Sequence, residues 1–124
     1  MFELDFRFRA GVLRALVLAA ERSVEGGIAH WRAIAAEVNR RRPRGLLVVA
    51  DIPGEPMDPL QQPRFFAAMR GSGLEAVRVA FVDANTRHSP HAETAEILAV
   101  EHGFNARVFP DEQAAERWLH YGAA

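Results

Sequence analysis

Cysteine and lysine are both missing from this sequence of 124 residues, in which all 15 basic residues are arginine. Without cysteine, the chain cannot form disulfides, a thiolate zinc site or a cysteine nucleophile. Without lysine, it cannot form a Schiff base or use the lysine of a phosphate-binding P-loop. These absences exclude several classes of enzyme, and they favour a non-enzymatic protein that carries no cofactor.

Long apolar runs and a strong excess of one charge are lacking as well. No run approaches the roughly 20 residues of a transmembrane helix, and the first residues alternate instead of forming the apolar centre of a signal peptide. We therefore expect a bacterial cytoplasmic protein that is not an integral membrane protein. The formal net charge is −1, without the basic excess of a nucleic-acid-binding domain, so no nucleic-acid partner is expected.

Apolar residues, by contrast, make up 49% of the chain, enough for a single domain spanning residues 1–124 to build its own core. The residues Phe2–Phe8 alternate between apolar and charged, which predicts a strand with one buried and one solvated face. A turn at Ala10 and Gly11 is followed by a more apolar strand at Val12–Leu18. Together these segments predict an antiparallel hairpin.

Beyond the hairpin, helical patterns alternate with short apolar strands. Each predicted helix follows a Ser or Asp that can cap it; these caps are Ser23, Asp58, Ser89 and Asp111. The remaining strands are predicted at Gly45–Ile52, Ala76–Val82 and Ala106–Phe109. The order β-β-α-β-α-β-α-β-α predicts an α/β fold with a mixed, mainly parallel sheet of about five strands and about four helices. On the first helix, Trp31 is predicted to be buried and His30 to face the surface.

Polar residues gather where two central strands end. Asp51 and Asp83 each end a predicted parallel strand, and open α/β sheets bind ligands beside these ends. The loop after Asp83 adds Arg87, His88 and His91. These side chains could bind an anion, and the two histidines could face one metal ion. The alternative is that they are ordinary polar loop residues without a ligand.

The element order resembles that of the STAS domain, the fold of bacterial anti-sigma-factor antagonists and of sulfate-transporter tails. The apolar strand Gly45–Ile52, with Asp51 near its end, looks like a strand of that family. Asp58 falls close to the family's second aspartate, and residues 106–119 look like the closing strand and helix of bacterial STAS-like proteins. The resemblance covers most of the chain from about Val12 onward.

The resemblance implies a regulatory module that binds a protein partner through the loop Asp51–Leu60 and the helix Leu60–Arg70. The residues assigned to partner or ligand binding are Asp51, Gly54, Asp58, Asp83 and Arg87. In the antagonists, a phosphorylatable serine follows the second aspartate, whereas here that position is Pro59. No Ser or Thr lies anywhere between Arg44 and Arg70, so the phosphorylation switch is not expected.

Two other functions compete with this interpretation. Some STAS-like proteins are related in shape to lipid-transfer domains, so the apolar helix faces could part to form a pocket for a lipid or another small molecule. A metal-dependent enzyme using Asp83, His88 and His91 is the third hypothesis. A homodimer is also expected to be possible, because the edge strand Phe2–Phe8 would leave an unpaired edge that needs covering.

Overall fold

The structure is a computed structural model of the chain, and it describes residues 2–85 and 90–122. Its strands are β1 (Phe2–Arg9), β2 (Val12–Ala19), β3 (Gly45–Asp51), β4 (Arg78–Asp83) and β5 (Asn105–Phe109). Its α-helices are α1 (Val24–Arg41), α2 (Gln62–Met69), α3 (Pro90–Glu101) and α4 (Glu112–Tyr121), and a short 3₁₀ helix spans Leu74–Ala76. Within the described residues, one sheet runs in the order β1-β2-β3-β4-β5, antiparallel between β1 and β2 and parallel elsewhere. The predicted α/β fold, its mixed sheet and its element order are confirmed.

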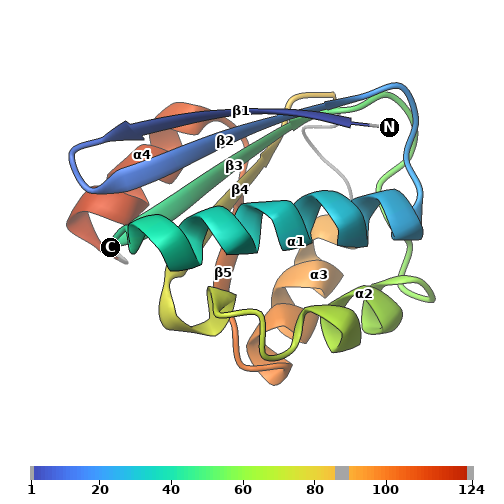
Figure 1. Cartoon of the computed structure of the whole chain (residues 1–124). Helices are drawn as coiled ribbons and strands as arrows, with labels where there is room; N and C mark the ends of the chain where they lie inside the picture. Colours follow the sequence, from blue (N-terminus) through green and yellow to red (C-terminus); the bar gives the residue numbers. More distant parts are fainter. Residues whose placement is uncertain (1, 86–89, 123–124) are drawn as a thin grey trace.

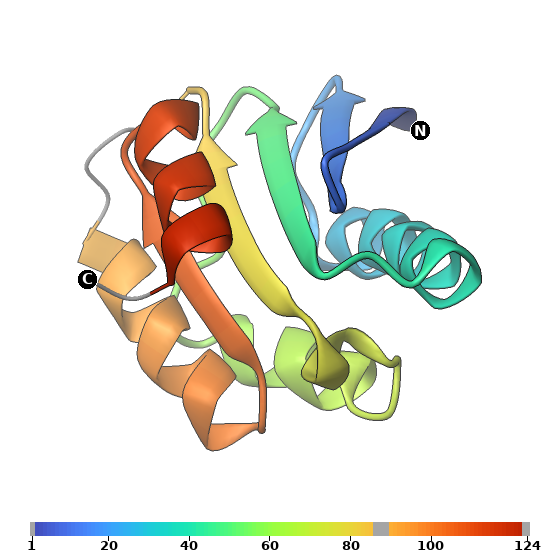
Figure 2. The same ribbon diagram turned by 90° about the vertical axis from the view of Figure 1, so that its left-hand side faces the viewer.

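The helices divide into two layers around the sheet. Strand order follows chain order, and right-handed crossovers then place α1, α2 and α3 on the same face. Helix α4 packs on the opposite face (Figures 1 and 2). No helix within the described ranges combines the length and the apolar character needed to cross a membrane.

The central strand β3 faces a core on each side of the sheet. Leu46 and Val48 belong to the larger core beneath α1, α2 and α3. Leu47 and Val49 belong to the smaller core beneath α4, together with Trp118. Burial on both faces explains why this strand is a continuous apolar run rather than an alternating one.

The hairpin at the N-terminus depends on a two-residue turn. Ala10 and Gly11 have φ angles of 53° and 80°, the positive values that a type I′ hairpin turn requires. The resulting register aligns Arg9 with Val12 and continues without a break to Phe2 opposite Ala19. It turns the apolar side chains of β1 towards α1 and leaves the charged ones exposed.

The predicted N-terminal caps are confirmed at two helices, α1 and α4. The Ser23 hydroxyl accepts a hydrogen bond from the Gly26 N–H at 2.9 Å. The Asp111 carboxylate accepts one from the Ala114 N–H at 2.8 Å. Both bonds satisfy a backbone donor that the first turn of a helix leaves unpaired. Ser89, the third predicted cap, lies outside the described residues.

The predicted start of α2 at Asp58 is too early. The helix begins at Gln62, and Asp58 instead closes a turn before it. Its carboxylate accepts from the N–H groups of Leu60, at 2.9 Å, and Gln61, at 3.0 Å. An aspartate at a turn and one at a helix cap make the same short-range hydrogen bonds, so the sequence pattern did not separate them.

The prediction that His30 faces the surface is wrong. This side chain is only 8% exposed, and its ring meets the ring of Phe2 edge-on, with centroids 5.8 Å apart. The hairpin extends over the flank of α1 and covers it. Burial, assisted by the positive charge of Arg22, lowers the pKa of His30 to about 4. The covering strand is distant in sequence, so the helical pattern of α1 alone could not predict this.

Candidate functional site

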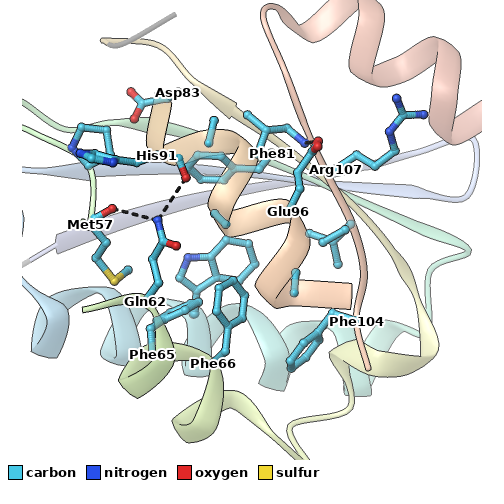
Figure 3. Close-up of a pocket in the computed structure, with 18 of the residues that line it drawn as sticks. Met57, Gln62, Phe65, Phe66, Phe81, Asp83, His91, Glu96, Phe104 and Arg107 are labelled. Carbon is cyan, nitrogen blue, oxygen red and sulfur yellow. Dashed lines mark hydrogen bonds between the residues drawn. The ribbon is translucent and has the colours of Figure 1, made fainter. Parts of the chain in front are cut away.

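A cavity of about 190 Å³ lies between the sheet and the two helices α2 and α3 (Figure 3). Strands β4 and β5 form its floor, α2 and α3 form its walls, and the connection before α2 and Trp31 of α1 complete it. Its apolar lining residues include Trp31, Met57, Phe65, Phe66, Met69, Leu74, Val79, Phe81, Ala92, Ala95, Ala99, Phe104, Ala106 and Val108. The cavity is therefore a mainly apolar space that borders the larger core and is partly open to solvent, with its polar groups concentrated in a few positions.

The cavity arises because small side chains face large, rigid ones. On α3, Ala92, Ala95 and Ala99 follow one another at spacings of three and four and line the same wall. Opposite them, aromatic rings pack against one another, with the Trp31 ring 6.1 Å from that of Phe65 and 6.2 Å from that of Phe81. Rings held by other rings cannot collapse into the space that the alanines leave, so the cavity persists.

Gln62 places an unpartnered acceptor in this apolar cavity. The side chain is 3% exposed. Its amide nitrogen donates to two backbone carbonyls, those of Met57 and His91, each at 3.1 Å. Its Oε1 atom is buried and has no hydrogen-bond partner among the described residues. An unpaired buried acceptor destabilises the fold by about 1–3 kcal/mol.

The orientation of this amide is fixed by its two bonds. Reversing the Gln62 amide would place its oxygen against the carbonyls of Met57 and His91, which cannot donate. The nitrogen must therefore face them, and the oxygen is turned away from both carbonyls (Figure 3). Because Met57 precedes α2 and His91 lies in the first turn of α3, the same bonds tie the two walls of the cavity together.

Asp83 is buried at the end of β4 and lines the polar end of the cavity. A terminal nitrogen of Arg22 lies 2.9 and 2.8 Å from its two carboxylate oxygens and also donates to the Ile52 carbonyl at 2.8 Å. The Nε atom of Arg22 is buried without a hydrogen-bond partner among the described residues. The structure thus balances the Asp83 carboxylate with a cation that the sequence pattern had not assigned to the site.

Asp51 lies on the same rim as Asp83 but stays exposed to solvent. Its carboxylate accepts from the Asn85 side-chain amide at 2.7 Å, and the Asn85 backbone N–H donates to Asp83 at 3.0 Å. Asn85 therefore links the two aspartates, and the predicted neighbourhood of Asp51 and Asp83 exists. The register supports it, because Ala50 of β3 is paired with Asp83 of β4.

Of the other predicted site residues that the structure describes, two lie in the connection before α2 and one in the first turn of α3. Gly54, with φ of +99°, and Asp58 belong to the segment between β3 and α2, whose Pro56 and Met57 line the cavity while these two do not. His91 is partly buried and lines the cavity. Arg87 and His88 lie outside the described residues. Among the residues that are described, no group of three His, Asp or Glu side chains could hold a metal ion.

One sequence signal for the cavity was present and was missed. Gln62 lies three, four and seven residues before Phe65, Phe66 and Met69, and these positions share one face of a helix. A glutamine on an otherwise apolar face is a buried polar group and needs a partner. Arg22 gave no comparable signal, because it lies in an irregular segment between β2 and α1.

Comparison with known proteins does not add to this description. No protein-family model matches the chain, and no curated protein matches it either.

Proposed function

We propose that this protein binds a small, neutral, mainly apolar molecule in the cavity between α2 and α3, and that the ligand donates a hydrogen bond to Gln62. The observation that supports the proposal is an apolar cavity holding one buried, fixed and unpartnered acceptor, the Gln62 Oε1 atom. The amide nitrogen of Gln62 ties the walls of the cavity together, whereas its oxygen has no hydrogen-bond partner among the described residues. A ligand with a hydroxyl or N–H group would relieve the destabilisation that the acceptor causes.

The volume limits the size of the ligand. An apolar cavity of about 150 Å³ in another protein stays dry and binds benzene, and the cavity here is about 190 Å³. A single aromatic ring with one substituent, or a short aliphatic chain, therefore fits. Each methylene group that such a ligand buries contributes about 0.8 kcal/mol to binding. Of the two ligands considered from the sequence, a lipid and another small molecule, this proposal takes the small molecule.

The polar groups favour a neutral donor over an anion. The Gln62 oxygen would repel a carboxylate, and Arg22 at the same end of the cavity already pairs with Asp83 at 2.8 Å. The aromatic walls formed by Trp31, Phe65 and Phe81 suit a ring stacked or packed edge-on. Phenols, short alcohols and small amides meet all of these conditions.

The matched pair of phenol and toluene tests this chemistry. The two molecules are nearly equal in size, and only phenol can donate a hydrogen bond. We expect nuclear magnetic resonance titrations of the wild-type protein to show tighter binding of phenol than of toluene. In Gln62→Leu the preference should reverse, as in a purely apolar cavity. The change in relative affinity should be about tenfold, the effect of roughly 1.4 kcal/mol.

Two further variants locate the binding. Ala95→Phe places a ring in the cavity and should abolish binding of both molecules. Ala67→Phe makes the same change on the exposed face of α2 and should leave binding unchanged. Equal binding by wild type and Ala95→Phe, or a phenol preference that survives in Gln62→Leu, would refute the proposal.

We propose protein binding by the connection before α2 as a second function, in keeping with the STAS resemblance. Leu60 at the end of this connection is 91% exposed, and the Asp58 carboxylate fixes the turn that presents it. An exposed leucine held on an ordered turn can bury its side chain against a partner with little loss of entropy. A partner captured from source-cell extract by wild type and equally by Leu60→Asp would count against this second function.

A further inference from the structure

The two edges of the sheet are protected to different extents. At one edge, β5 has five residues, and its Val108 N–H donates to the Glu96 carboxylate of α3 at 2.6 Å. A side chain thus occupies a backbone donor that another strand would need. At the other edge, β1 has eight residues and pairs with β2 in an unbroken register. It contains no proline and no bulge, two of the devices that block an edge strand.

The side chains of β1 divide sharply between its two faces. Phe2, Leu4 and Phe6 face α1 and are partly buried, whereas Phe8 on the same face remains 44% exposed. The opposite face of β1 carries only charged residues, all exposed, because α4 packs on β3, β4 and β5. In chain order these charged residues are Glu3, Asp5, Arg7 and Arg9. Two acids are therefore followed by two bases at a spacing of two residues.

We infer that β1 pairs with β1 of a second copy of this chain, antiparallel, about a two-fold axis at Phe6. An isologous interface brings the same strand from each copy together. With Phe6 at the axis, Asp5 of each copy lies opposite Arg7 of the other, and Glu3 lies opposite Arg9. On the other face, Leu4 lies opposite Phe8. The dimer would form one continuous sheet from the strands of both copies.

Other registers of the same antiparallel pairing place like charges together. An axis at Asp5 sets the two Asp5 side chains opposite each other, and an axis at Arg7 does the same for arginine. An axis at Leu4 pairs Glu3 with Asp5, and one at Phe8 pairs Arg7 with Arg9. Directly opposed opposite charges stabilise a sheet, and like charges destabilise it. Only the register centred on Phe6 matches every charge on β1 with its opposite.

The same register also covers the exposed aromatic ring on this edge. Phe8 would pack against Leu4 of the second copy, while the Arg41 guanidinium, 5.8 Å from the centre of the Phe8 ring, covers its other side. The alternate residues of β1 whose N–H and C=O groups face away from β2 would gain partners. The dimer thus satisfies the backbone, the charges and the apolar face of β1 in one arrangement.

Charge reversal tests both the dimer and its register. In analytical ultracentrifugation, wild type should sediment as a dimer at a protein concentration of about 100 µM, because an interface of this small size is expected to be weak. In a dimer of Asp5→Arg, the new arginine of each copy faces Arg7 of the other copy. In a dimer of Arg7→Asp, the new aspartate of each copy faces Asp5 of the other copy. Each single variant should raise the dimer dissociation constant about tenfold or more. The double variant Asp5→Arg/Arg7→Asp restores opposite charges and should dimerise like wild type.

Mixing the two single variants gives the sharpest result. In a mixed pair, two arginines from one copy face two aspartates from the other, so the heterodimer should form more tightly than the homodimer of either variant. Native mass spectrometry distinguishes the species because the variants differ in mass. Glu101→Arg on α3 is the control and should leave the dimer unchanged. A monomeric wild type, or single variants that dimerise like wild type, would overturn the inference, as would a mixture without heterodimer.

Discussion

The buried His30 makes the stability of this protein depend on pH between about 6.5 and 4. Its pKa is lowered to about 4 in the folded state, first by burial and then by Arg22, from an ordinary value of 6.5. Between these two values the unfolded chain binds more protons than the folded one. The free energy of unfolding therefore falls as the pH drops from about 6.5 towards 4.

The magnitude follows from the two pKa values. At pH 5 the histidine of an unfolded chain is almost fully protonated, whereas His30 in the folded chain is mostly neutral. Linkage then gives a loss of about 2 kcal/mol between pH 7.5 and pH 5. Several glutamates also have a lowered pKa, but their stabilisation is lost mainly below about pH 5. These residues are Glu25, Glu37, Glu75 and Glu112.

Urea unfolding at pH 7.5 and pH 5 measures this loss directly. His30→Leu keeps an apolar side chain under the hairpin and should lose about 2 kcal/mol less than wild type over the same range. His120→Gln, at a partly exposed position, is the control and should keep the wild-type dependence. If wild type and His30→Leu lose equal stability, the burial of His30 does not have the effect described above.

Further substitutions test the rim, the cavity and a helix cap. Asp83→Asn leaves Arg22 buried without its counter-charge and should lower the free energy of unfolding by about 3 kcal/mol; adding Arg22→Met should recover more than half of this in urea titrations. Ala95→Leu partly fills the cavity and should raise the melting temperature, with a gain of about 1 kcal/mol, while weakening phenol binding. Ser23→Ala removes the α1 cap and should destabilise the protein by about 1 kcal/mol; an unchanged denaturation midpoint would contradict this.

The fold could be predicted because its signals are local. The alternation of apolar and charged residues in Phe2–Phe8 and the apolar run of β3 indicate which strand faces are buried. The order of strands and helices along the chain then predicts a mainly parallel sheet. The same reasoning brought Asp51 and Asp83 together, because the ends of neighbouring parallel strands must share an edge. The structure links them through Asn85, a residue that the sequence pattern did not single out.

The place and the size of the cavity could not be predicted, because they depend on a distance between elements. The alanines of α3 would have allowed the helix to pack closely on the sheet, as small residues often do. They leave a space here because Trp31, Phe65 and Phe81 hold one another in place. Contacts of this kind join α1, α2 and β4, and no local pattern contains them. His30 was misassigned for the same reason, since a strand distant in sequence covers it.

The STAS resemblance remains a hypothesis about function, while the cavity gives a more specific one. The predicted partner-binding segment and the cavity share one connection, because Met57 lines the cavity and Leu60 is exposed a few residues later. Gln62 is hydrogen-bonded to the Met57 carbonyl at 3.1 Å. A ligand that engages the free oxygen of Gln62 would therefore act on the residue that anchors this connection.

A crystal structure of the protein soaked in phenol tests the central claim most directly. We expect the ring to lie between Phe81 and the alanines of α3, with its hydroxyl oxygen about 2.8 Å from the Gln62 Oε1 atom. Phenol bound elsewhere, or bound in the cavity with its hydroxyl turned away from Gln62, would contradict the claim.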